Sequence, residues 1–277
     1  MSAGNRGARI GAGLLLALVL LALWPTAWLP HDPLAQDLLR RLEPPSAQYW
    51  LGTDMLGRCN FSRVAAATRI SLGAALVAAG ALLGVALLWG VSAAVCAGRT
   101  RWRWVDALLM RAADVLLGFP TLVLALAIIG VVGPSLTTVV VALVVAWAPG
   151  LARIVRVLTL EALQREHVAA AHAAGLPAAV VVRRHVLPGL LAPLAVLASL
   201  ETAGVLLALS SLSFLGLGAQ PPTPEWGVML SEARPFVQTA PHLLWGPGLA
   251  VLLATLAFQL LGEGLRSKLD TRAPLRW

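Results

Sequence analysis

The chain has 277 residues, of which 58% are hydrophobic and only 12% are charged, and its formal net charge is +8. Soluble proteins carry about 25% charged residues, so this composition indicates a membrane protein and argues against a soluble enzyme. The hydrophobic residues are gathered in long runs separated by short polar segments, which is the pattern of a polytopic membrane protein.

Five long stretches of the sequence contain no charged residue. They cover residues 10–29, 70–98, 115–152, 202–219 and 243–262. Gly133-Pro134 is a turn signal that divides the third stretch into two spans of about 18 residues, near the lower limit for crossing a bilayer. The fourth stretch extends back to Val186 if Glu201 is tolerated inside the membrane. The sequence therefore predicts an all-α polytopic membrane protein with six transmembrane helices.

The basic residues predict the orientation of these helices. With a cytoplasmic N-terminus, the inward segments are residues 1–9, 99–114, 153–185 and 263–277, and they hold 15 of the 21 basic residues. This bias satisfies the positive-inside rule with both termini in the cytoplasm. The net positive charge is then explained by topology and contact with anionic lipid, and no nucleic-acid partner is predicted. The two long outward loops are residues 31–69 and 220–242.

One inward segment, residues 161–188, is polar, basic and rich in alanine. Residues 161–174 are good helix formers, Gly175 ends that run, and Pro177 is acceptable near the first turn of a second short helix. We therefore expect a helix–turn–helix outside the bilayer, with a partner on that face. The alternative is an amphipathic hairpin that lies on anionic lipid.

The sequence carries no motif of a self-contained enzyme. Its single lysine, Lys268, is not preceded by the glycine loop of a nucleotide-binding site. His167 and His172 are five residues apart, which places them on different helix faces and excludes an HExxH zinc site. We predict no catalytic residue, no cofactor and no metal ligand in this chain. Any energy source for transport would then lie elsewhere.

Several motifs resemble those of one family. Ala169-Ala170-Ala171, followed by Gly175 and then by Leu187-Pro188, resembles the EAA loop of ABC-importer permeases. Further similarity to the dipeptide, oligopeptide and nickel permeases is carried by LGTDMLGR at 51–58, WVDALLMR at 104–111, SLSFLGLG at 211–218, QPPTPEWG at 220–227 and LGEGLR at 261–266. The pattern resembles the second of the two paired permeases in such systems.

This resemblance implies a permease subunit with the fold of a type I ABC importer in the inner (plasma) membrane. It also implies a homologous permease as heterodimer partner, two separate ATPase subunits and an extracytoplasmic solute-binding protein. Residues 1–69 would form the tail, first helix and outer loop, and residues 70–277 the five-helix core with the coupling loop at 160–188. The implied ATPase-coupling residues are Ala169, Ala170, Ala171, Gly175, Leu176, Arg183, Arg184, Leu187 and Pro188. The glutamate that names the motif is Ala169 here.

The cargo class implied by the resemblance is peptides, with nickel or glutathione as alternatives within the family. A rival from another class is a self-contained secondary transporter, which would carry embedded charge pairs and inverted repeats. Glu201 is the one acidic residue predicted inside a span. It either lines the pathway and attracts a cationic group, or is a protonated or hydrogen-bonded acid, with Thr202 or Ser199, that fixes helix packing.

Charged residues next to the predicted spans raise similar alternatives. Arg58, Arg63 and Arg69 either bind a docking receptor or pair with Asp54 and the loop's other acids to hold the outer mouth. Asp106 and Asp114 are expected to flank the start of the third helix. They could pair with Arg103 or Arg111, and Asp114 is expected to complement the helix dipole.

Overall fold

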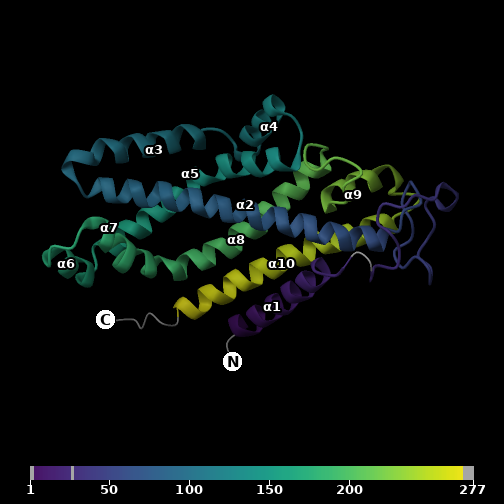
Figure 1. The fold of residues 1–277 in the computed structure, drawn as a ribbon, viewed down its shortest axis with the longest axis horizontal. Helices are drawn as coiled ribbons and strands as arrows, with labels where there is room; N and C mark the ends of the chain where they lie inside the picture. The colour runs from purple at the N-terminus through teal and green to yellow at the C-terminus, as the bar shows by residue number, and fades with distance from the viewer. Residues whose placement is uncertain (1–2, 26–27, 271–277) are drawn as a thin grey trace.

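A computed structural model describes residues 3–25 and 28–270, which form an elongated bundle of α-helices. The loop that precedes α2 lies at one end of the long axis, and α6 and α7 lie at the other (Figure 1). Within the described residues the only β pairing is an isolated bridge between Thr53 and Cys59. The predicted all-α class is confirmed.

Ten α-helices lie in the described part of the chain. They are α1 (Ala3–Ala22), α2 (Asn60–Ala97), α3 (Arg103–Leu117), α4 (Thr121–Val132), α5 (Leu136–Leu163), α6 (Glu166–Ala173), α7 (Ala178–Val181), α8 (Leu187–Phe214), α9 (Trp226–Ala233) and α10 (His242–Asp270). A π-helical turn over Val182–Val186 joins α7 to α8, so the helical path is continuous from Ala178 to Phe214.

Four helical segments are long and apolar enough to cross a membrane, namely α2, α5, Ala178–Phe214 and His242–Leu269. The pair formed by α3 and α4 adds a fifth if it counts as one span, and it is bent by 87°. The count of six predicted from the sequence is therefore not reproduced exactly by length and composition in the described residues. The remaining predicted span corresponds to α1, which has 20 residues and packs along α10.

The third predicted span differs most from the expectation. A single helix was expected to end at Gly133, whereas the structure has α3 up to Leu117 and then α4, which is only 12 residues long. Pro120 explains the break, because proline disfavours helical backbone at the residue before it, here Phe119. The turn at Gly133 is found as predicted: its φ is +104°, a value that glycine adopts without strain.

The second span begins ten residues earlier than the charge-free run. α2 starts at Asn60, so Arg63 and Arg69 lie inside the helix and not in the predicted outer loop of residues 31–69. Gly90 brings α2 close to α5, since a Cβ atom there would lie 2.5 Å from the carbonyl oxygen of Ala152. Gly80 and Gly84, whose spacing also permits close helix contact, meet nothing within 4 Å.

Two clusters of buried side chains hold the bundle together. The larger one joins α2, α4, α5 and α8 and reaches into the segment between α5 and α8. The other joins α1, α2, α8, α9 and α10. Burial of apolar side chains contributes roughly 25 cal/mol per Å² where it removes them from water. The chain thus forms one connected bundle.

A buried ion-pair cluster lies at the end of the bundle that carries the loop before α2 (Figure 1). Asp54 accepts hydrogen bonds from the amides of Leu56 and Arg58 at 2.8 and 3.0 Å. Its carboxylate also binds Arg58 Nε at 2.6 Å and the Arg63 guanidinium. Glu232 of α9 lies 3.2 Å from Arg58 and 2.9 Å from Arg63. Both arginines are only 1% exposed, so for Arg58 and Arg63 the structure supports pairing with the acids over an exposed docking role. Arg69 is exposed and forms no ion pair within the described residues, so the predicted pairing does not extend to it.

A second buried acid, Glu225, begins α9 nearby. Its carboxylate accepts from the amide of Val228 and from the hydroxyl of Ser71 in α2, both at 3.0 Å. The side chain is fully buried, and this burial raises its pKa above the ordinary 4.5, although hydrogen bonds from Gly227, Val228, Ser71 and Ser213 oppose the shift.

This shift predicts a pH dependence of stability. Because the folded state holds the proton more tightly, Glu225 contributes stability below pH 4.5 that is lost as the pH rises through the raised pKa. Glu225→Gln keeps an acceptor for the helix cap but does not titrate. The variant should therefore gain thermal stability relative to the parent as the pH rises above 4.5. Melting curves in detergent across this range test it, and a pH-independent difference would contradict it.

Candidate functional site

The segment between α5 and α8 forms a separate lobe at one end of the bundle (Figure 1). The single helix expected over residues 161–174 is two helices, because α5 ends at Leu163 and α6 begins at Glu166. The amides of Val168 and Ala169 donate to the carbonyl of Arg165 at 3.0 and 3.1 Å, which starts α6 in a new direction.

Gly175 ends α6 as predicted. The amide of Leu176 donates to the carbonyl of Ala171 at 3.3 Å, which is the hydrogen bond of a Schellman motif. Gly175 has φ +77°, and a Cβ atom there would meet nothing within 4 Å. The backbone conformation, and not crowding, therefore calls for glycine. Pro177 precedes α7, where its carbonyl accepts from the amides of Val180 and Val181.

One face of the lobe is anchored in the bundle core. Val168, Val181 and Val186 are 0% exposed, and all three belong to the larger buried cluster. Ala171, one of the predicted coupling residues, joins them. Sequence reasoning missed the three valines, although their apolar character within a polar segment was the available signal. Any force applied to the lobe is therefore transmitted through packed side chains to α5 and α8.

The opposite face is exposed and consists mostly of small residues, with the charged Glu166 one turn before Ala170. Ala169, Ala170, Gly175 and Leu176 are all exposed and lie on α6 and the turn that follows it. We call these four residues the α6 surface. Alanine and glycine leave the helix backbone accessible at close range, and Leu176 adds an exposed apolar side chain. Such a surface can pack closely against another protein.

The remaining predicted coupling residues lie further along the chain. Arg183 and Arg184 are exposed in the π-helical turn. They follow the α6 surface by a few residues in the sequence but belong to a different element. Leu187 and Pro188 are the first residues of α8 and so belong to the span, not to the short helices of the lobe. The structure thus separates the predicted set into the exposed α6 surface, the buried Ala171, the π-helical turn and the start of α8.

Two ion pairs brace α3 against α5 on the same half of the bundle. Asp106 accepts two hydrogen bonds from Arg156, at 2.7 and 2.6 Å, and Asp114 pairs with Arg153. The expected pairing with Arg103 or Arg111 is wrong. Asp114 also lies in the last turn of α3, so the expected role at a helix N-terminus is wrong as well. A two-point arginine–carboxylate contact fixes orientation as well as distance.

Glu201 lies in the middle of α8 and is partly exposed. Leu197 and Val205, one turn to either side, both pack with the cluster that includes α2 and α5. Thr202 donates to the carbonyl of Ala198 at 2.6 Å, and Ser199 donates to that of Phe258 at 2.7 Å. No hydrogen bond joins Glu201 to either hydroxyl in the described residues, so the partners expected for a hydrogen-bonded packing role are not found. The protonated-acid and pathway alternatives both stay predictions.

The sequence matches one family over most of its length. Residues 66–273 match the family described as the inner membrane component of binding-protein-dependent transport systems. This match begins inside α2, runs through α10 and includes the whole lobe between α5 and α8.

Individual relatives are similar over nearly the whole chain. The nickel transport system permease protein NikC of Escherichia coli strain K12 is 41% identical over 95% of this chain and 93% of its own length. The glutathione transport system permease protein GsiD of Pectobacterium atrosepticum is also 41% identical, over 95% and 86%. The dipeptide transport system permease protein DppC of Alkalihalophilus pseudofirmus is 36% identical, over 97% and 86%. The chain therefore belongs to the inner-membrane permeases of ABC importers, in the peptide and nickel family.

Proposed function

We propose that this chain forms half of a translocation pathway for peptides and that the α6 surface docks into a groove on a separate ATPase subunit. The observation that carries the proposal is the two-sided lobe, which is anchored in the core by valines and exposes the mostly small residues of the α6 surface next to Glu166. This arrangement suits a part that receives motion from a partner and passes it to α5 and α8.

The charges around the α6 surface support the same partner. Arg165, Arg183 and Arg184 are exposed near it and can meet acidic residues at the rim of a groove. Ala169 replaces the glutamate of the family motif, so docking would rest on shape and on these arginines and not on a carboxylate. With this lobe in the cytoplasm, both termini are cytoplasmic as well.

In the proposed assembly this chain pairs with a homologous permease, two ATPase subunits and an extracytoplasmic solute-binding protein. ATP binding would close the ATPases, and the lobe would follow them and shift the bundle between inward-open and outward-open states. Nickel or glutathione is the alternative cargo within the family, as the names of the relatives suggest. A self-contained secondary transporter is the alternative from another class.

Affinity purification from native membranes distinguishes these functions. A tagged chain should co-purify with an ATPase and a second permease, and vesicles containing the complex should need ATP and the solute-binding protein for uptake. Uptake by the isolated chain, driven by an ion gradient alone, would contradict the proposal. The solute bound by the co-encoded binding protein then identifies the cargo.

We further propose that Glu201 faces the pathway and attracts a positively charged group of the cargo. Replacing Glu201 by glutamine removes the charge and leaves the size unchanged. An interaction of about 1 kcal/mol predicts a roughly fivefold loss of uptake for a cationic peptide. Glu263→Gln, at an exposed position on α10, is the matched control and should transport normally. Unchanged uptake by Glu201→Gln would end the pathway role.

A further inference from the structure

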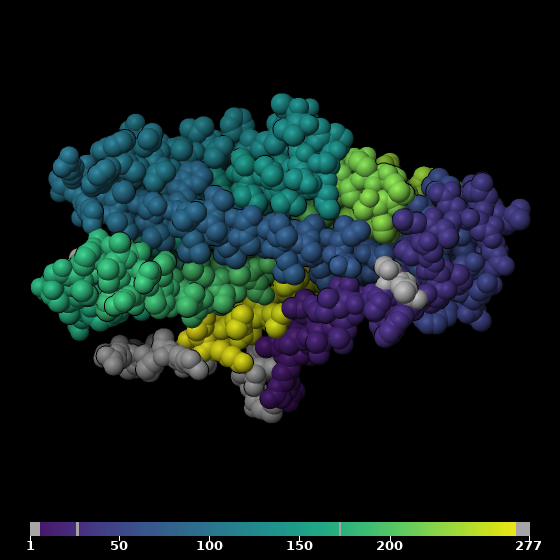
Figure 2. All heavy atoms as spheres, viewed as in Figure 1, coloured from purple at the N-terminus to yellow at the C-terminus, as the bar shows by residue number. Residues whose placement is uncertain are grey.

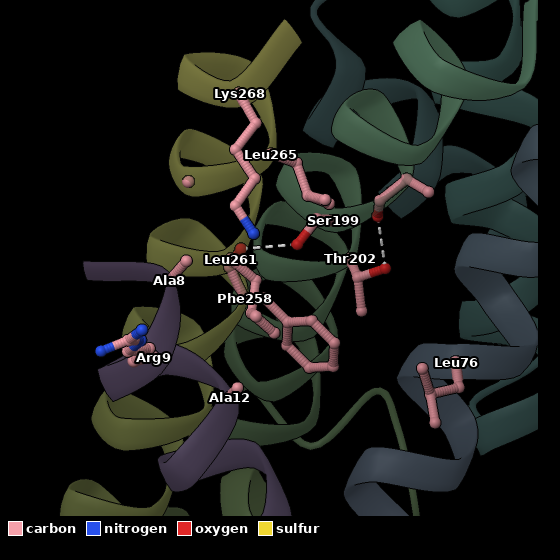
Figure 3. A pocket seen from close by; sticks show the side chains of 12 residues that line it. Ala8, Arg9, Ala12, Leu76, Ser199, Thr202, Phe258, Leu261, Leu265 and Lys268 are labelled. Carbon is pink, nitrogen blue, oxygen red and sulfur yellow. Dashed lines mark hydrogen bonds between the residues drawn. The ribbon is translucent and has the colours of Figure 1, made fainter. Parts of the chain in front are cut away.

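A cavity of about 790 Å³ lies between α1, α2, α8 and α10 (Figure 3). Its volume is in the range of about 300–1,000 Å³ that is typical of ligand sites. Figure 2 shows α1 and the C-terminal half of α10 side by side at the edge of the molecule, where this cavity lies. None of the coupling residues lines it.

The packing of α1 explains the cavity. Gly11 brings α1 against α10, because a Cβ atom at Gly11 would lie 2.8 Å from the carbonyl oxygen of Ala257. Towards the outer end Leu18 is buried in the cluster with α2. Towards the inner end Ala8 and Ala12 present only methyl groups, so α1 leaves a gap towards α2 instead of filling it.

The interior of the cavity is apolar. Leu76 of α2, Phe258 and Leu261 of α10 supply most of its larger side chains. Its two hydroxyl groups, on Ser199 and Thr202, donate to main-chain carbonyls of Phe258 and Ala198. Both donors are therefore already used, and a peptide or other polar solute would find few partners here. An alkyl chain needs none.

The charged side chains that line the cavity are both cationic. Arg9 comes from the first turns of α1 and Lys268 from the last turns of α10. The Lys268 side chain extends along α10 towards Ser199 (Figure 3). Arg9 is exposed and forms no ion pair with any residue in the ranges that the structure describes. The site therefore combines an apolar interior with positive charge.

We propose that this cavity binds an anionic phospholipid, with an acyl chain against Leu76 and Phe258 and the headgroup phosphate between Arg9 and Lys268. The ligand class follows from the two cationic side chains among the lining residues and from the lack of available polar groups in the rest of the lining. The assignment to the cytoplasmic leaflet rests on the orientation proposed above, but the binding measurement does not depend on it. A lipid bound here would contact α1, α8 and α10 at the same time and so hold these helices together.

Native mass spectrometry of the purified importer complex tests the site. The complex is mixed with dioleoylphosphatidylglycerol or with dioleoylphosphatidylcholine, and the lipid retained on the permease is measured. The wild type should retain the anionic lipid at least about fivefold better, since one basic residue near a headgroup contributes that much.

Two pairs of variants separate the site from general attraction to lipid. Arg9→Gln should lower retention of phosphatidylglycerol about fivefold. Arg6→Gln removes the same charge from the same exposed segment but lies outside the cavity, so it should have little effect. Ala12→Phe should exclude both lipids by filling the cavity, whereas Ala17→Phe, exposed on α1 and outside the cavity, should not.

The proposal is overturned if the wild-type complex retains both lipids equally, or if Arg6→Gln weakens retention as much as Arg9→Gln. It is also overturned if no lipid remains in the assembled complex, because another subunit would then cover the cavity. These outcomes leave the ATPase proposal intact, since co-purification of the subunits is scored separately.

Discussion

Replacing Ala170 by arginine should abolish coupled transport without unfolding the protein. Ala170 is exposed in the middle of α6, and arginine is nearly as good a helix former as alanine. The long charged side chain would stand on the α6 surface and keep the partner groove at a distance. A loss of more than about 2 kcal/mol of docking energy corresponds to a fall of about thirtyfold in affinity.

The measurement has two parts, the amount of ATPase that co-purifies and the ATP-dependent uptake by vesicles. Ala179→Arg is the matched control, because Ala179 is exposed on α7 and lies outside the α6 surface. Ala170→Arg should lose both ATPase and uptake, and Ala179→Arg should keep both. If Ala170→Arg retains its ATPase and its uptake, the α6 surface is not the docking site.

Local signals in the sequence were sufficient for the parts of the fold that depend on local chemistry. The predicted turns at Gly133 and Gly175 both follow from the backbone freedom of glycine, which adopts a positive φ at each of them. The long apolar runs likewise located α2, α5, α8 and α10. Each of these features is decided within about one helical turn or one apolar run.

Features that depend on distant partners were not predictable in the same way. α2 starts at Asn60 and therefore contains Arg63, although the charge pattern predicted that this residue lies in a loop. The buried charge of Arg63 is compensated by Glu232 of α9, which is distant in the sequence. The pairing of Asp106 with Arg156 likewise joins residues 50 positions apart. A single sequence gives no signal for pairs of residues that are distant in the chain. The small residues of the α6 surface, by contrast, can be read directly from the sequence.

Replacing Asp54 by asparagine should strongly destabilise the end of the bundle that carries the loop before α2. Asp54 is the common partner of Arg58 and Arg63, which are buried together with it, and Glu232 is the only other acid that contacts them in the described residues. Asparagine retains an acceptor for the amides of Leu56 and Arg58 but removes the charge. Two buried guanidinium groups would then share one carboxylate.

Removal of one partner from a buried ion pair costs about 3–5 kcal/mol, because the remaining charge is left without compensation. For a chain of this size that cost predicts a fall of roughly 10 °C in the melting temperature. Thermal unfolding of the purified complex in detergent measures it. Asp37→Asn is the matched control, because Asp37 pairs with Arg40 at 3.5 Å on the exposed surface and should matter little.

A second substitution identifies the cause of the loss. Arg63→Met in the Asp54→Asn background removes one of the two uncompensated charges and keeps a flexible side chain of similar length. If the cost comes from buried positive charge, the double variant should be more stable than Asp54→Asn alone. If the double variant is less stable by the sum of the two single effects, Arg63 and Asp54 act independently and the ion-pair cluster does not stabilise this end of the bundle as a unit.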